Sequence, residues 1–156
     1  MAIPKAVPKN ETTLTLRRTY PASRKKVFDA WTDPQALSRW FAPSPEHRCA
    51  EAVVDLRVGG RYRIDMRTPD GTSHPVGGVF REIKASERLV FTWRWEKPEL
   101  DEGETLVTVQ LREHGDGTEM ELTHELPTVE SRDKHGWGWK GCLAGLNEYF
   151  GGARNP

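Results

Sequence analysis

The side chains that could carry catalytic or metal chemistry are scattered along this sequence of 156 residues. The five histidines, at positions 47, 74, 114, 124 and 135, lack the spacing of metal ligands, so we expect no metal site. No GxSxG motif is present, and neither Cys49 nor Cys142 has a histidine at a spacing that predicts a nucleophile–base pair. Gly59-Gly60 and Gly151-Gly152 lack the residues of a phosphate-binding loop. The sequence therefore predicts neither covalent catalysis nor a bound cofactor.

Acid–base chemistry has four candidate groups. These are His124, His135 and the carboxylates Asp55 and Glu82, whose orientation the pattern leaves open. His124 has two interpretations, because a histidine at the end of an apolar row serves either as a hydrogen-bonded structural group or as a functional one. The sequence offers little support for an enzyme, and we assign no catalytic residue.

The composition narrows the classes of partner. The 23 basic and 23 acidic side chains are interleaved along the chain, so we expect neither a nucleic acid nor a membrane as partner. No apolar stretch reaches the roughly 18 residues that span a bilayer, and the first residues lack the apolar centre of a secretion signal. These features favour a cytoplasmic protein whose two cysteines are reduced.

The elements that must position these groups follow in a clear order. Residues 1–11 are expected to form a flexible lead-in, and residues 12–156 a single domain. An alternating strand at 13–20 precedes two short helices, which Ser23 and Asp33-Pro34 are placed to begin. Six more strands and a C-terminal helix follow, with the strands expected at about 51–57, 61–67, 74–83, 88–96, 104–113 and 118–125. This order predicts an α+β fold with a seven-stranded antiparallel sheet.

One face of the sheet is unusually aromatic. Strict alternation in residues 88–95 puts Leu89, Phe91, Trp93 and Trp95 on the same side. The C-terminal helix has an apolar stripe of matching size, formed by Trp139, Leu143, Leu146 and Phe150. A curved sheet wrapped around one long helix is therefore predicted. The function depends on whether these rings fill the space between sheet and helix or leave a pocket.

Other strands continue the inward face. The inward sets are Tyr62, Ile64 and Met66; Val107, Val109 and Leu111; and Met120, Leu122 and His124. Arg61, Arg63, Asp65 and Arg67 are expected to face solvent. The facing of strand 74–83 is undecided, because Gly77-Gly78 inside a strand marks either a bulge or a close backbone approach. Gly138, Gly141 and Gly145 form a stripe on the C-terminal helix, for which tight packing is favoured over a ligand slot.

Several segments, taken in order, resemble a known family. They are PASRKKVFDAWTDPQALSRWFAP, DLRVGGRYRIDM, PDG, GGVFREI, ERLVFTWRW, VTVQL, GTEMELTHE and HGWGWKGCLAGL. Together they resemble the bacterial branch of the activator of heat-shock-protein-90 ATPase homologues, within the START-like or SRPBCC superfamily. The resemblance implies the helix-grip fold, with two short helices after the first strand, and a cavity between sheet and helix that binds apolar molecules in various relatives. It transfers no catalytic residue.

Three functions are therefore considered. The favoured one is the binding of a small hydrophobic or amphipathic molecule; the alternatives are an enzyme of the cyclase or hydratase type using the same cavity, and a module that binds a chaperone and stimulates its ATPase. The protein is expected to be a monomer or a homodimer. The predicted ligand-binding residues are Tyr62, Ile64, Met66, Phe91, Trp93, Trp95, Val109, Met120, Leu122, His124, Trp139 and Leu143.

Overall fold

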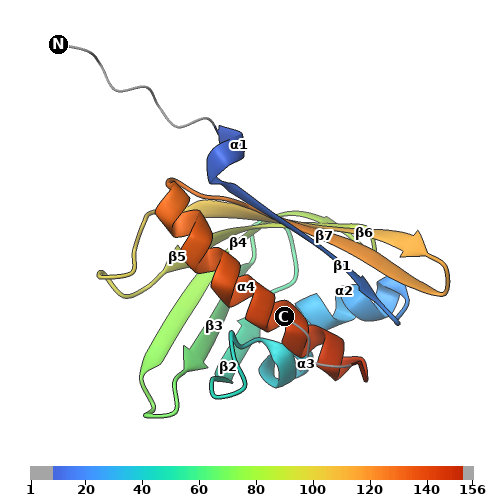
Figure 1. Cartoon of the computed structure of the whole chain (residues 1–156), viewed down its shortest axis with the longest axis horizontal. Helices are drawn as coiled ribbons and strands as arrows, with labels where there is room; N and C mark the ends of the chain where they lie inside the picture. Colours follow the sequence, from blue (N-terminus) through green and yellow to red (C-terminus); the bar gives the residue numbers. More distant parts are fainter. Residues whose placement is uncertain (1–8, 153–156) are drawn as a thin grey trace.

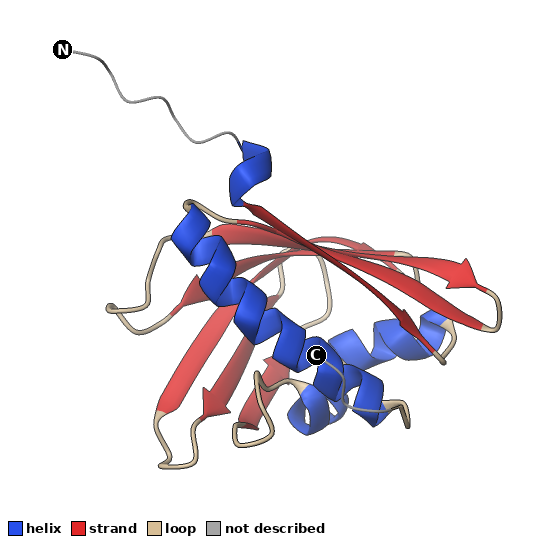
Figure 2. Ribbon diagram, viewed as in Figure 1, coloured by secondary structure: helices blue, strands red, loops and turns tan. Residues whose placement is uncertain are grey.

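The computed structural model describes residues 9–152, which form a seven-stranded antiparallel sheet around a long helix (Figure 1). The sheet order is β1-β7-β6-β5-β4-β3-β2. Its curvature wraps the strands around the helix α4, as Figure 2 shows. The elements in chain order are α1 (Lys9–Thr12), β1 (Thr13–Tyr20), α2 (Arg24–Thr32), α3 (Pro34–Trp40), β2 (Arg48–Val54), β3 (Arg61–Arg67), β4 (Ser73–Lys84), β5 (Arg88–Trp95), β6 (Thr105–His114), β7 (Gly117–Glu125) and α4 (Val129–Tyr149).

The helices begin at the predicted capping residues. The Ser23 side chain accepts a hydrogen bond from the backbone N–H of Lys26, and Asp33 accepts one from Gln35. Pro34 occupies the first turn of α3, where a missing N–H costs nothing. Thr128 caps α4, which crosses the concave side of the sheet and ends beside α2 and α3 (Figure 1).

The predicted α+β helix-grip architecture is confirmed, with two differences at element ends. Strand β2 begins and ends three residues earlier than expected, because the chain leaves the sheet at Asp55 for a turn in which Gly59 has a positive φ of 85°. A short helix, α1, was not expected, and Arg132 of α4 donates a hydrogen bond to the Glu11 carbonyl within it. The rest of the predicted lead-in, residues 1–8, lies outside the described residues.

The structure settles the facing of β4. Val76 and Phe80 are buried on the inward face, and Gly78 lies between Tyr62 of β3 and the backbone of β5. A Cβ at Gly78 would lie 2.0 Å from the Thr92 carbonyl oxygen, to which the Tyr62 hydroxyl also donates a hydrogen bond at 2.5 Å. A register shift follows between Phe80 and Glu82. Of the two alternatives for the glycine pair, the close backbone approach is therefore confirmed, whereas the bulge of this strand lies beyond Phe80 and not at the glycines.

One outward residue of β3 is buried. Asp65 was expected to face solvent, yet it is only 4% exposed. It accepts hydrogen bonds from Arg67 Nε at 3.1 Å and from the Ser73 hydroxyl. These donors lower the pKa of Asp65, although burial opposes them. The prediction for this residue was wrong because alternation gives the face of a strand but not the side chains that cover it.

Candidate functional site

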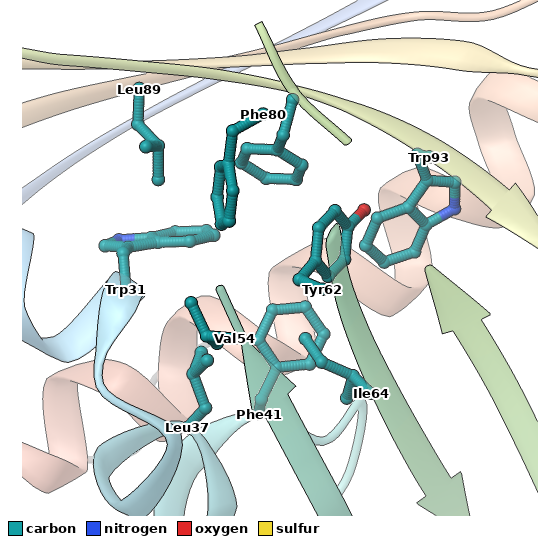
Figure 3. Close-up of a pocket in the computed structure, with 10 residues that line it drawn as sticks. Trp31, Leu37, Phe41, Val54, Tyr62, Ile64, Phe80, Leu89 and Trp93 are labelled. Carbon is teal, nitrogen blue, oxygen red and sulfur yellow. The ribbon is translucent and has the colours of Figure 1, made fainter. Parts of the chain in front are cut away.

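The centre of the interface between sheet and helices is filled by side chains. The cavity left there has a volume of about 20 Å³, room for one water molecule at most. Trp31 of α2 and Phe41 after α3 point into this space, which Tyr62 and Phe80 enter from the sheet (Figure 3). Phe91 also lines it, with its ring centroid 6.4 Å from that of Trp31. Because large rings enter from both layers, an organic ligand does not fit here.

A much larger cavity opens at one end of the same interface. Its volume is about 590 Å³, and it lies between β5, the connection that follows β5 and the N-terminal half of α4. Such a volume is within the range of small-molecule sites. The apolar part of its wall is formed by Phe41, Met66, Trp93, Trp95, Trp139 and Cys142. The space large enough for a small molecule is therefore at this end of the interface between sheet and α4, which we call the mouth of the fold.

The twelve predicted ligand-binding residues divide into three groups. Met66, Trp93, Trp95 and Trp139 line the large cavity. Tyr62, Ile64, Phe91 and again Trp93 line the small one. The remaining five are buried and line neither of these cavities; they are Val109, Met120, Leu122, His124 and Leu143. A single pocket lined by all twelve is thus not formed, and ligand binding at any of them stays a prediction.

His124 lies behind the wall of the large cavity, with both ring nitrogens hydrogen bonded. The indole N–H of Trp139 donates to Nδ1 at 3.1 Å, and the Thr105 hydroxyl lies 2.7 Å from Nε2. An indole N–H can only donate, so Nδ1 accepts and the neutral ring carries its proton on Nε2. The Thr105 hydroxyl therefore accepts from His124 and donates to the Trp93 carbonyl at 3.0 Å. The network holds His124 as a neutral ring that orients Trp139, and a role of His124 in ligand binding stays a prediction.

His135 on α4 is held in the same way but with the opposite tautomer. Trp95 Nε1 donates to its Nε2 at 3.1 Å, and its Nδ1 donates to the Ser131 carbonyl at 2.9 Å. The Ser131 hydroxyl in turn lies 3.0 Å from a Glu102 carboxylate oxygen and donates to it. The two imidazole rings lie 4.9 Å apart, centroid to centroid, in an edge-to-face arrangement. Both acceptor nitrogens of the pair are therefore occupied by tryptophan donors.

One tryptophan donor at the cavity has no partner. Among the described residues, the buried side-chain nitrogens without a hydrogen bond are those of Trp31 and Trp93. Trp93 is 4% exposed and forms part of the walls of both cavities. In Figure 3 its nitrogen lies on the side of the indole that faces away from Tyr62 and the small cavity. A buried N–H without an acceptor costs roughly 1–3 kcal/mol, and protein atoms cover this one, so the cost belongs to the packing of the core.

The other sequence candidates lie away from the cavity. Asp55 and Glu82, considered as inward carboxylates, are exposed on the outer surface. Each pairs with an arginine, Asp55 with Arg57 and Glu82 with Arg88. The acid–base candidates near the cavity thus reduce to the two histidines. The alternation could not orient the carboxylates because both lie near a turn or a register shift.

Burial lowers the pKa of His124 well below its ordinary value of 6.5, and the neighbouring His135 lowers it further. In acid the unfolded chain therefore takes up a proton that folded His124 does not. Stability is fully present above pH 6.5 and falls as the pH is lowered toward the folded pKa, by about 1.4 kcal/mol per pH unit for this one group. We expect urea unfolding between pH 7 and 5 to show this loss.

The variant His124→Gln removes that titration and should reduce the pH dependence by the share of this one group, while His135 and His74, whose pKa burial also lowers, keep theirs. His114→Gln, at the exposed end of β6, is the matched control and should keep the slope. An unchanged slope in His124→Gln would show that other groups cause the acid destabilisation.

Metal and membrane sites find no support in the described residues. Between residues 9 and 152, no group of three or more histidine, cysteine, aspartate or glutamate side chains is arranged to hold a metal ion. Within the same range, no helix combines the length and the apolar character needed to cross a bilayer.

The sheet, the gripping arrangement around α4 and the cavity at its mouth together define a START-like, helix-grip protein. The family model described as "Activator of Hsp90 ATPase homolog 1-like protein" matches residues 21–151. The chain therefore belongs to this family. None of the curated proteins compared with the chain matches it significantly.

Solved structures agree with this assignment. A Chromobacterium violaceum protein is 28% identical, with a TM-score of 0.80 over 88% of this chain and 95% of its own. The AHSA1-like protein from Aeromonas hydrophila is 26% identical, with a TM-score of 0.74 over 88% and 90% of the two chains. CalU16 from Micromonospora echinospora is 29% identical, with a TM-score of 0.69 over 88% and 75%.

Proposed function

We propose that this protein binds a small amphipathic molecule in the large cavity at the mouth of the helix-grip fold. The observation that carries the proposal is a space of about 590 Å³ whose inner wall is built from three tryptophans, Trp93, Trp95 and Trp139. Indole rings offer large apolar faces at little entropic cost, which favours a ligand with a flat apolar part. The rim of the cavity carries the charged side chains Glu99, Glu102, Glu130 and Lys134. The end of the ligand that lies at this rim would therefore be polar as well.

The hydrogen bonds of the wall also support a binding site. Trp95 and Trp139 are fixed by His135 and His124, so their rings keep one orientation without a ligand. A preorganised wall lowers the entropy lost on binding.

Trp137 extends the site outward: it lines the cavity, is 63% exposed, and lies 6.5 Å from His47 between ring centroids. An exposed tryptophan at a cavity mouth is well placed to cover a bound ligand.

The test uses Gly138, which lies on the cavity wall. A Cβ at this position would meet no atom within 4 Å, so a larger side chain can enter the cavity without disturbing the core. We expect Gly138→Phe to weaken the binding of N-phenyl-1-naphthylamine, a neutral fluorescent probe, by at least about 10-fold, because the added ring occupies the probe's space.

Gly138→Ala, which adds a single carbon, is the matched control and should bind the probe like the unmodified protein. Circular dichroism would confirm that both variants fold. Equal affinity in Gly138→Phe would place the probe elsewhere and contradict the proposal. Native mass spectrometry of freshly purified protein would then give the mass of any retained natural ligand.

The pair of histidines favours one second candidate, an enzyme with a general base. Burial lowers the pKa of His135, so this ring is neutral at pH 7 and could accept a proton. Its Nε2 is engaged by Trp95, which is half-buried at the cavity wall. A substrate would have to displace the Trp95 N–H before His135 could act. We rank this function second because the hydrogen bond from Trp95 occupies the one nitrogen of His135 that could accept a proton.

Chaperone binding and a cytoplasmic location remain proposals that rest on the family and on the sequence. The exposed apolar side chains Val53, Leu56 and Val58 follow the edge strand β2 and its turn, where a protein partner could dock. Pull-down with a chaperone should then depend on these residues and not on Gly138. Loss of chaperone capture in Gly138→Phe would instead tie both activities to the cavity.

A further inference from the structure

The rim of the large cavity carries an excess of negative charge. Its ionised side chains are the carboxylates Glu99, Glu102 and Glu130 and the ammonium of Lys134. Lys134 pairs with Glu130 at 3.1 Å, four residues earlier on α4. Within residues 9–152, neither Glu99 nor Glu102 forms an ion pair. Two uncompensated carboxylates therefore border the opening.

Glu102 is held in place by a neutral partner. Its carboxylate accepts a hydrogen bond from the Ser131 hydroxyl, and Ser131 is buried in the first turn of α4. This contact fixes the position of the carboxylate and leaves its charge in place. Of the positive groups nearby, Lys134 pairs with Glu130 and the Ser131 N–H is capped by Thr128, whereas Lys97, whose charge acts on His74 of the cavity wall, has no ion pair among the described residues. The charged side chains that line the cavity nevertheless keep a net negative sign, which disfavours an anionic ligand.

The tryptophan rings of the cavity wall also favour a positively charged ligand. Trp93 and Trp95 stand perpendicular at 5.5 Å between ring centroids, and Trp139 lies 5.0 Å from Trp93 at an angle of 45°. The faces of indole rings attract cations, most strongly where water is excluded. Rings and carboxylates on one cavity therefore act together on a positively charged group.

We propose that the cavity selects an amphipathic organic cation, with a flat apolar body against the tryptophans and an ammonium group beside Glu99 and Glu102. This inference rests on the proposed function, since it specifies the chemistry of the molecule bound in the same cavity. It assigns the two carboxylates as specificity-determining residues.

The experiment compares three probes with the same ring system by isothermal titration calorimetry at pH 7. They are (6-methoxynaphthalen-2-yl)methanamine, the corresponding methanol and 6-methoxy-2-naphthoate, which are cationic, neutral and anionic. We expect the amine to bind about 10-fold more tightly than the alcohol and the carboxylate to bind most weakly. The preference should decrease as salt is added, because the rim is open to solvent.

Matched variants test the assignment of the carboxylates. Glu102→Gln keeps an acceptor for Ser131 but removes the charge, and together with Glu99→Gln it should reduce the preference for the amine to about 2-fold or less. Glu104→Gln is the control, because Glu104 lies on the same connection but pairs with Arg81 and does not line the cavity. It should leave the preference unchanged.

The outcomes separate the two proposals. If none of the three probes binds, the proposed function and the cation preference both fail. If the alcohol or the carboxylate binds as tightly as the amine, the cavity binds ligands but the cation preference is wrong. If the amine keeps its advantage in the double glutamine variant, the carboxylates do not determine the specificity.

Discussion

Gly141→Ala should lower the free energy of unfolding by about 2 kcal/mol, although alanine is the better helix former by about 1 kcal/mol. The reason is the backbone of the loop after α3. A Cβ at Gly141 would lie 1.7 Å from the Pro43 carbonyl oxygen and 2.5 Å from its carbonyl carbon. Neither atom can rotate away as a side chain would, so α4 and the loop must separate. Urea unfolding at pH 7 measures the loss.

Gly138→Ala provides the control on the same helix. An added Cβ meets nothing within 4 Å at this position, so only the gain in helix propensity remains, about 1 kcal/mol of added stability. Two identical substitutions three residues apart should therefore change the stability in opposite directions. A stabilised Gly141→Ala variant would show that the loop at Pro43 yields at little cost.

His124→Leu should have an even larger effect, a loss of about 3 kcal/mol in the free energy of unfolding. Leucine has a volume similar to that of histidine, so the loss comes mainly from polar groups. The buried N–H of Trp139 would lose its acceptor, and the half-buried Thr105 hydroxyl would lose its donor. A buried group left without a partner costs roughly 1–3 kcal/mol. Thermal or urea unfolding measures the change.

A double-mutant cycle separates this effect from simple repacking. Trp139→Phe leaves the Nδ1 acceptor of His124 without a donor, whereas the double variant His124→Leu with Trp139→Phe removes both partners together. We expect the double variant to lose less stability than the two single changes combined, with a coupling energy of about 0.5–3 kcal/mol. Additive losses would mean that the hydrogen bond contributes nothing beyond packing.

The hydrogen-bond network also relates the core to the proposed site. His124 is fully buried, yet it fixes Trp139, whose ring forms part of the cavity wall. Thr105 continues the network to the Trp93 carbonyl. Variants at His124 are therefore expected to weaken probe binding through the orientation of the wall, in addition to their effect on stability.

The sequence by itself predicted the fold in considerable detail. The alternation of Phe91, Trp93 and Trp95 gave the inward face of β5, and the capping residues Ser23 and Asp33 gave the start of α2 and α3. These features are local, since a strand repeats every two residues and a helix start needs a hydrogen-bond acceptor at one position. The family followed from the same segments, and the family model agrees.

The position of the cavity was decided by the tertiary structure alone. Trp31 and Phe41, from outside the sheet, fill the centre of the interface, and the cavity of about 590 Å³ lies at the mouth, beside His135 and Glu102. The tertiary structure also decided the roles of the glycines on α4. Gly141 packs against a backbone carbonyl, whereas Gly138 borders the cavity. Periodicity tells which way a side chain points, but the volume that remains depends on residues that meet from distant parts of the chain.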